Sequence, residues 1–99
     1  IYPREIEEAL YAHPLIEEAA VIGIPDKLRG QAVCTYIVLT EGADLDKKAL
    51  RKYLMERLAV YKVPREFFFC AQLPKNSTGK ILKTALREQA LIDMVSRKR

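Results

Sequence analysis

Residues 19–40 read AAVIGIPDKLRGQAVCTYIVLT, two runs of apolar and β-branched residues on either side of a turn-like stretch. The first run, Ala19 to Ile24, is short and lies between acidic residues and a Pro-Asp pair, which suits a buried strand better than a helix. The second run, Gln31 to Thr40, is rich in valine, isoleucine, threonine and tyrosine, and these residues favour strands. We therefore expect two strands, joined by a turn or short loop over Pro25 to Gly30.

Two amphipathic helices are expected on either side of these strands. The first spans Pro3 to His13, because proline is tolerated in a first helical turn and apolar residues follow at helical spacing. The second begins after Asp44 or Asp46, either of which can cap it, and ends near Ala59.

A third strand and a third helix complete the expected elements. Three phenylalanines in succession within Glu66 to Ala71 indicate a strand that is buried on both faces. An amphipathic pattern from Leu82 to about Lys98 predicts the helix, with Ala85, Leu86, Ile92 and Val95 facing inward. The order helix, strand, strand, helix, strand, loop, helix predicts an α+β fold in which three helices cover a small sheet of about three main strands.

Length and composition indicate one globular domain over residues 1–99. The chain is 49% hydrophobic and 30% charged, and it has no apolar run of the 18 or more residues that a transmembrane segment needs. It starts at Ile1 without a charged-then-apolar leader, so we expect a piece of a longer protein without a secretory signal. Cys34 and Cys70 lie in apolar stretches without metal-ligand spacing, which predicts buried reduced thiols and a cytoplasmic location.

The positive charge is concentrated at the C-terminal end. The formal net charge is +4, with one basic residue against six acidic ones in residues 1–26 and seven against two in residues 75–99. This pattern is typical either of an anion-binding region or of a solvated helix face with a basic tail. Nucleic acid is not an expected partner, because Phe67 to Phe69 look like core residues rather than exposed stacking platforms.

Most catalytic constellations are absent from the sequence. The single histidine, His13, lies on the inner face of a predicted helix and is expected to be structural, which leaves no Ser/His/Asp set and no metal site. The Gly79-Lys80 pair is not a Walker phosphate-binding loop, since the first glycine of that motif is missing and Ile81 follows the lysine.

The segment from Gln72 to Gly79, with Lys80 at its end, carries the remaining chemistry. It is dense in turn-forming residues, holds hardly any apolar residues, and is therefore expected to be an exposed, mobile loop. Ser77, Thr78 and Gly79 can approach phosphate oxygens, and Lys80 at the end of the loop is a point charge suited to developing negative charge. A solvated connection without function is the alternative interpretation.

The decapeptide LPKNSTGKIL at residues 73–82 resembles the last signature motif of the acyl-adenylate-forming enzymes, which include acyl-CoA synthetases, peptide-synthetase adenylation domains and luciferases. Three further stretches match in the expected order, namely IYPREIEE at 1–8, AAVIGIPD at 19–26 with Arg29-Gly30, and YKVP at 61–64. The whole chain is similar to the small C-terminal α+β domain of these enzymes, and most similar to that of fatty-acid and other acyl-CoA ligases.

This resemblance implies a two-step ligase reaction in the full-length protein. A carboxylic acid and ATP, with Mg, form acyl-AMP, and CoA then displaces AMP to give a thioester. In the family the motif lysine serves adenylation, and that position is Lys80. The partner is the protein's own large N-terminal domain, so the 99-residue piece alone is expected to be inactive and to bind none of ATP, AMP or CoA tightly.

Several assignments stay open. The resemblance places the hinge and the border of the CoA channel before the position of Ile1, so no CoA site is assigned. Arg29-Gly30 and the pair Tyr61 and Lys62 are interpreted either as interdomain contacts or as ordinary turn and helix-end residues, and Lys75 as a supporting charge. A peptide-synthetase type of adenylation domain and a non-catalytic interaction module remain alternatives to an acyl-CoA ligase.

Overall fold

The computed structural model describes residues 2–28 and 30–97. In these residues the chain forms three helices, α1 (Pro3–Tyr11), α2 (Lys47–Met55) and α3 (Lys83–Arg97), one 3-10 turn (Val60–Lys62), and three strands, β1 (Ile16–Asp26), β2 (Gly30–Leu39) and β3 (Glu66–Phe69). Their order along the chain is the predicted one, and the α+β fold is confirmed.

The strands form one mixed sheet in the order β1-β2-β3. β1 and β2 are antiparallel neighbours joined by a tight connection, with Asp26 opposite Gly30 at its end. β2 and β3 are parallel, with residues 34–37 opposite residues 66–69, and the connection between them contains α2. Parallel neighbours require such a crossover, because the chain must return to the same end of the sheet.

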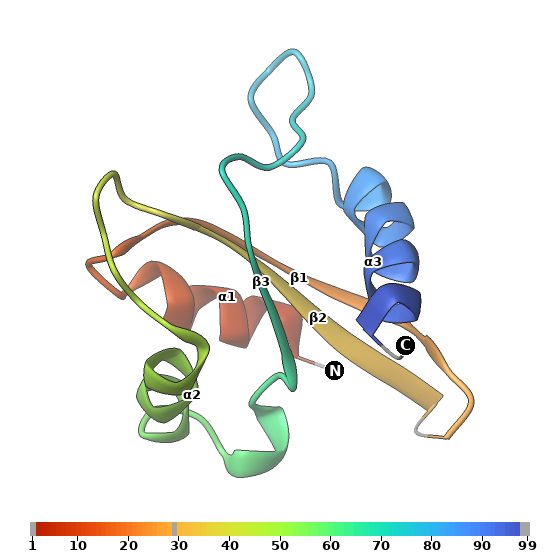
Figure 1. Ribbon diagram of the computed structural model, residues 1–99, viewed down its shortest axis with the longest axis horizontal. Helices are drawn as coiled ribbons and strands as arrows, with labels where there is room; N and C mark the ends of the chain where they lie inside the picture. The colour runs from red at the N-terminus through yellow and green to blue at the C-terminus, as the bar shows by residue number, and fades with distance from the viewer. Residues whose placement is uncertain (1, 29, 98–99) are drawn as a thin grey trace.

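Helices cover both faces of the sheet, with α1 and α2 on one side and α3 on the other (Figure 1). Side chains alternate between the faces of a strand, so one set of strand residues packs on α3 and the other packs on α1 and α2. The α3 side contains Ala20, Ile22, Ile24, Ala32, Cys34, Tyr36, Val38, Leu86, Ala90 and Met94. The opposite side contains Ile6, Leu10, Ala19, Val21, Ile37, Leu50, Leu54 and Phe67. This double coverage explains why the strands are nearly continuous apolar runs.

The predicted inner face of α3 is partly wrong. Leu86, Ala90 and Met94 are buried against the sheet, whereas Ile92 is 62% exposed and Val95 is 57% exposed. The buried residues are spaced by four and form one stripe, and Ile92 lies about 200° around the helix from Ala90. Apolar residues occur on more than one side of α3, so spacing alone did not select the buried stripe.

Element ends also differ from the prediction. β3 ends at Phe69, and of its three phenylalanines Phe67 is buried while Phe69 is 37% exposed, so burial on both faces was wrong for this edge strand. α2 ends at Met55 instead of near residue 59. Its cap is Asp46, whose Oδ1 accepts a 2.7 Å hydrogen bond from Ala49 N.

His13 and the two cysteines have structural surroundings. His13 lies just beyond α1 rather than on its inner face; its Nδ1 accepts from Leu15 N at 3.0 Å and its ring meets Tyr53 edge-on at 4.6 Å. Burial, and secondarily the charge of Arg57, lowers the pKa of His13. Neither cysteine forms a disulfide within the described residues; Cys34 is buried as predicted, whereas Cys70 is partly exposed. None of the described helices is long and apolar enough to cross a membrane.

Candidate active site

The loop between β3 and α3 projects beyond the rest of the domain, at the top of Figure 1. Its two arms run antiparallel: Lys75 pairs with Ile81, and Leu82 N donates to Pro74 O at 2.9 Å. Residues 74–80 are exposed, as predicted. The base is not free of apolar anchors, however, because Leu73 is buried against the α3 side of the core and Ile81 packs beside it.

The tip of the loop is organised around Asn76. Its Oδ1 accepts three hydrogen bonds, from Thr78 N at 3.0 Å, Thr78 Oγ1 at 2.7 Å and Lys80 N at 2.9 Å. Its backbone N donates to Lys80 O at 2.9 Å, and its backbone O accepts from Gly79 N at 3.0 Å. Gly79 has φ +87°, a conformation that residues with a Cβ rarely adopt. The tip therefore has a defined turn geometry.

The structure places the three predicted nucleotide-contact residues in this turn. The backbone N–H groups of Thr78 and Gly79 both point inward to Asn76, and the Thr78 hydroxyl donates to the same residue. These groups are therefore not free donors for a phosphate in this conformation. A contact of Ser77, Thr78 or Gly79 with a nucleotide stays a prediction.

Lys80 is exposed, and its ammonium forms no hydrogen bond or ion pair with any residue in the described ranges. It lines an open groove of about 600 Å³, which is bordered by Asn76, Ile81 and Leu82 of the loop, Glu7 and Tyr11 of α1, Ala19 and Ala20 of β1, and Lys83 and Thr84 of α3. The groove lies where the loop, α1, the edge strand β1 and the start of α3 meet.

Two neighbouring lysines, in contrast, are engaged within the domain. Lys75 Nζ lies 2.6 Å from Glu18 Oε2, which ties the first arm of the loop to β1. Lys83 Nζ lies 2.7 Å from Glu7 Oε2, which ties the start of α3 to α1. The charge of Lys75 is compensated by Glu18 in this structure, and its role as a supporting charge stays a prediction. Of these three lysines, only Lys80 presents an uncompensated charge within the described part of the chain.

Asn76, Glu7 and Glu18 were missed as site residues by the sequence analysis. Asparagine in a loop is a turn signal, because its side chain commonly accepts a hydrogen bond from the backbone two residues on. This signal was available for Asn76. No sequence signal marks Glu18 as the partner of Lys75, since 57 positions separate them.

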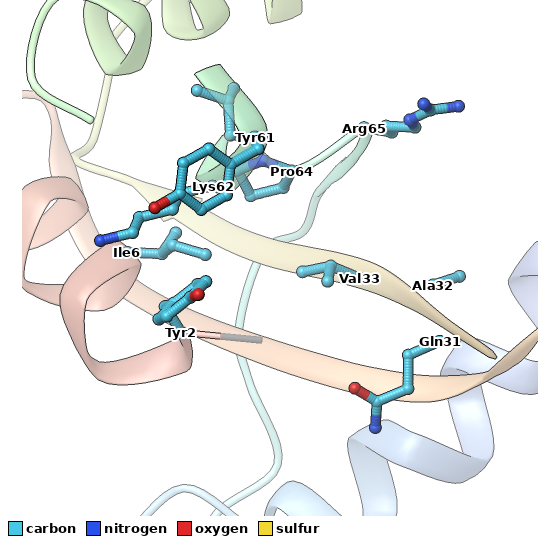
Figure 2. Close-up of a pocket in the computed structure, with 10 residues that line it drawn as sticks. Tyr2, Ile6, Gln31, Ala32, Val33, Tyr61, Lys62, Pro64 and Arg65 are labelled. Carbon is cyan, nitrogen blue, oxygen red and sulfur yellow. The ribbon is translucent and has the colours of Figure 1, made fainter. Parts of the chain in front are cut away.

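Tyr61 and Lys62 lie at a different place, in the wall of a pocket of about 250 Å³ shown in Figure 2. The Lys62 ammonium is 2.9 Å from Glu5 Oε2 and 4.6 Å from the centre of the Tyr2 ring, and the hydrogen bond to Glu5 raises the pKa of Lys62. Tyr61 meets Tyr2 edge-on at 6.1 Å and is 73% exposed. The structure therefore does not bring Tyr61 and Lys62 into the groove of Lys80, and Arg29 lies outside the described residues.

A resident metal ion does not fit this site. No group of three or more histidine, cysteine, aspartate or glutamate residues within the described ranges is arranged to hold one. The magnesium expected to accompany ATP is therefore not assigned to side chains of this chain.

Several known proteins contain a segment similar to this chain. The family described as "AMP-binding enzyme C-terminal domain" matches residues 5–80. A long-chain-fatty-acid–CoA ligase of Bacillus subtilis is 48% identical over 89 residues, which are 90% of this chain and 16% of that protein.

Two solved structures contain a similar domain. The Mycobacterium tuberculosis fatty acyl CoA synthetase superposes with a TM-score of 0.81 at 41% identity, over 89% of this chain and 17% of that chain. The amide bond synthetase McbA of Marinactinospora thermotolerans superposes with a TM-score of 0.83 at 37% identity, over 90% of this chain and 18% of that chain. The present chain thus spans less than a fifth of the length of these relatives.

Proposed function

The chain belongs to the family of AMP-binding enzyme C-terminal domains, and from this premise we propose that it is the mobile C-terminal domain of an acyl-CoA ligase in which Lys80 serves adenylation. The full-length ligase joins a carboxylic acid to ATP, releases pyrophosphate, and then transfers the acyl group from AMP to CoA. Most contacts to these substrates belong to the large N-terminal domain, which is the partner of this chain.

One observation carries the role of Lys80. Its ammonium is exposed at the tip of an ordered turn and lacks a carboxylate partner in the described residues, whereas Lys75 and Lys83 beside it are paired. An unpaired ammonium is free to bond to groups outside the domain. Its three donors on a flexible stem suit anionic oxygens whose charge changes during a reaction.

The chemistry of the first step explains the need for this charge. A carboxylate oxygen attacks the α-phosphorus of ATP, a bond to the acyl oxygen forms, and pyrophosphate leaves. Two anions approach one another, and negative charge accumulates on the oxygens around the α-phosphorus. A positioned ammonium that contacts these oxygens stabilises the transition state more than the separated substrates, which accelerates the step.

The second step does not require Lys80. The sulfur of CoA attacks the acyl carbonyl and AMP leaves, so charge develops at a different atom. We infer that the small domain rotates between the steps and withdraws Lys80 from the site, a hinge motion that serves both half-reactions. Exposed Tyr61 and the pocket around it are proposed as part of the surface that contacts the large domain in one orientation.

The test separates the two half-reactions in the full-length ligase. We expect Lys80→Ala to slow acyl-AMP formation, followed as pyrophosphate release, by about 10²-fold to 10³-fold. Thioester formation from preformed acyl-AMP and CoA should stay near the parental rate. Lys48→Ala, an exposed lysine on α2, is the control and should change neither rate. Equal losses in both steps, or no loss in the first, would contradict the proposed role.

The 99-residue chain alone is expected to be inactive. Lys80 acts on ATP and a carboxylate that the large domain holds, and the described residues contain no second group arranged for catalysis. Pyrophosphate release by the isolated chain from ATP and a fatty acid would contradict this expectation.

The likeness to the amide bond synthetase McbA favours a second candidate function. In this alternative the same adenylation is followed by transfer of the acyl group to an amine instead of CoA. Supplying preformed acyl-AMP with equal amounts of CoA and an amine distinguishes the two, because the acyl-CoA ligase gives mainly thioester and the alternative gives mainly amide.

A further inference from the structure

The hydrogen bonds at the tip of the β3–α3 loop converge on Asn76. We propose that Asn76 is a positioning residue that sets the direction in which Lys80 leaves the loop; this inference rests on the proposed function of Lys80. Asn76 contacts no substrate in this account and acts only through the lysine.

Asn76 holds both backbone polar groups of Lys80. Its side-chain Oδ1 accepts from Lys80 N at 2.9 Å, and its own backbone N donates to Lys80 O at 2.9 Å. With the N–H and the C=O of one residue both bonded to the same partner, the backbone dihedrals of Lys80 have little freedom, and these dihedrals set its Cα–Cβ direction. The Cα–Cβ bond of Lys80 therefore has a restricted direction, although the rest of the side chain is flexible.

The same carboxamide oxygen also shapes the turn that precedes Lys80. It accepts from the N and the Oγ1 of Thr78, so one oxygen gathers three donors from two residues. The amide nitrogen of Asn76 donates to none of the described residues. The acceptor oxygen, rather than the whole amide, is thus the structurally important group.

The other side-chain contacts of this loop within the described ranges lie outside its tip. The ion pairs Lys75–Glu18 and Lys83–Glu7 hold the two arms of the loop, outside the tip. Residues 74–80 are all exposed, so no apolar packing orders them. Without this oxygen the backbone bonds of residue 76 with Lys80 O and Gly79 N remain, but Lys80 N and Thr78 N lose their acceptor. The turn then samples more conformations, and the direction of the Lys80 side chain is less restricted.

The expected consequence is a loss of rate without a loss of substrate affinity. Misplacing a catalytic group by about 1 Å can cost up to about a hundredfold, so we expect Asn76→Ala to slow acyl-AMP formation at saturating ATP by about tenfold to a hundredfold. KM for ATP should stay unchanged, because in this account the large domain provides the ATP contacts.

The experiment compares three variants of the full-length ligase. Asn76→Ala removes the acceptor oxygen; Asn76→Ser keeps an uncharged acceptor oxygen, which forms the same kind of turn more weakly and adds no negative charge beside Lys80. We expect Asn76→Ser to be faster than Asn76→Ala in acyl-AMP formation, by up to about tenfold. Gln72→Ala, which removes an exposed amide without a described partner in the same loop, is the control and should match the parent.

The second half-reaction serves as the control for folding. Thioester formation from preformed acyl-AMP and CoA shows that a variant is folded and should be equal in all of them. The inference is overturned if Asn76→Ala adenylates at the parental rate, if Asn76→Ser is as slow as Asn76→Ala, or if KM for ATP rises while the saturated rate is unchanged. Lys80→Ala in the same assay separates the two proposals: if it is slow and Asn76→Ala is not, only the positioning role fails, whereas a fast Lys80→Ala contradicts the proposed function itself.

Discussion

The hydroxyl of Tyr36, in the central strand β2, donates a 2.7 Å hydrogen bond to Oδ2 of Asp93 on α3. The ring of Tyr36 stacks on Phe68 of β3 at 5.3 Å, and Oδ1 of Asp93 accepts from Gln89 at 2.9 Å. Tyr36 thus joins the two parallel strands to the helix that follows the Lys80 loop. Burial, reinforced by the hydrogen bond and the negative charge of Asp93, raises the pKa of Tyr36 well above its usual value.

We expect Tyr36→Phe to lower the free energy of unfolding of the 99-residue chain by about 1–2 kcal/mol at pH 7, because it removes a hydrogen bond to a charged group. Stability should also respond to alkaline pH. Because the folded-state pKa of Tyr36 is raised, the stabilisation by its hydroxyl is fully present below the unfolded tyrosine pKa of about 10. As pH rises above this value the stabilisation is lost, since the unfolded state releases the proton and the folded state keeps it.

Urea unfolding of the parent and Tyr36→Phe between pH 8 and pH 11 measures this effect. The stability difference between the two should be constant to about pH 10 and then shrink. A difference that grows with pH would contradict the assigned direction of the pKa. The comparison between variants removes the contributions of the other tyrosines and the lysines.

Glu7 is expected to stabilise the start of α3 and the edge of the sheet together. Its Oε2 accepts from Val21 N at 2.9 Å and from Lys83 Nζ at 2.7 Å. Glu7→Ala should lower the free energy of unfolding by about 1–3 kcal/mol, because the N–H of Val21 loses its partner. Glu7→Gln keeps an acceptor for Val21 and should cost at most about 1 kcal/mol, since Lys83 is partly exposed.

The neighbouring Glu8 provides the control for Glu7. It pairs with Arg4 at 3.9 Å on the exposed side of the same helix, so Glu8→Ala should hardly change the unfolding midpoint. Equal effects of the alanine substitutions at Glu7 and Glu8 would show that the contact with Val21 contributes nothing.

Thr35 is the expected site of a stabilising substitution. Its side chain is fully buried in β2, opposite Val21 on one side and Phe67 on the other, and its Oγ1 has no hydrogen-bond partner among the described residues. A buried hydroxyl without a partner costs about 1–3 kcal/mol, so Thr35→Val, which has the same shape, should raise the free energy of unfolding by about 1 kcal/mol or more. Thr35→Ser keeps the hydroxyl, loses a methyl group, and should be destabilised in the same denaturation experiment.

Gly79→Ala tests the conformation of the loop tip. Gly79 has φ +87° and open space around it, so an added methyl group is opposed only by the backbone conformation, at about 1–2 kcal/mol. In the full-length ligase we expect slower acyl-AMP formation, because the turn relaxes and Lys80 shifts. Gly42→Ala introduces the same strain at φ +76°, far from this loop in the sequence, and should leave the adenylation rate unchanged.

The sequence by itself determined the type and order of the elements and the location of the candidate site. Helical spacing and β-branched runs are local properties, so Pro3–Tyr11 and the two long strands were predicted with small errors at their ends. The density of turn residues before Lys80 was sufficient to predict an exposed loop, because such residues order the backbone through short-range bonds.

Only the tertiary structure decided which residues meet. Two ion pairs join residues that are 57 positions apart in the sequence, namely Lys75 with Glu18 and Lys62 with Glu5. The strand β3 lies parallel to β2 after a crossover that contains a helix. Their pairing depends on how the chain returns through space, which periodicity does not encode. α3 is the clearest case, since apolar residues lie on several of its sides and only docking on the sheet selected Leu86, Ala90 and Met94 over Ile92. The same long-range docking leaves the charge of Lys80 uncompensated while its neighbours are paired.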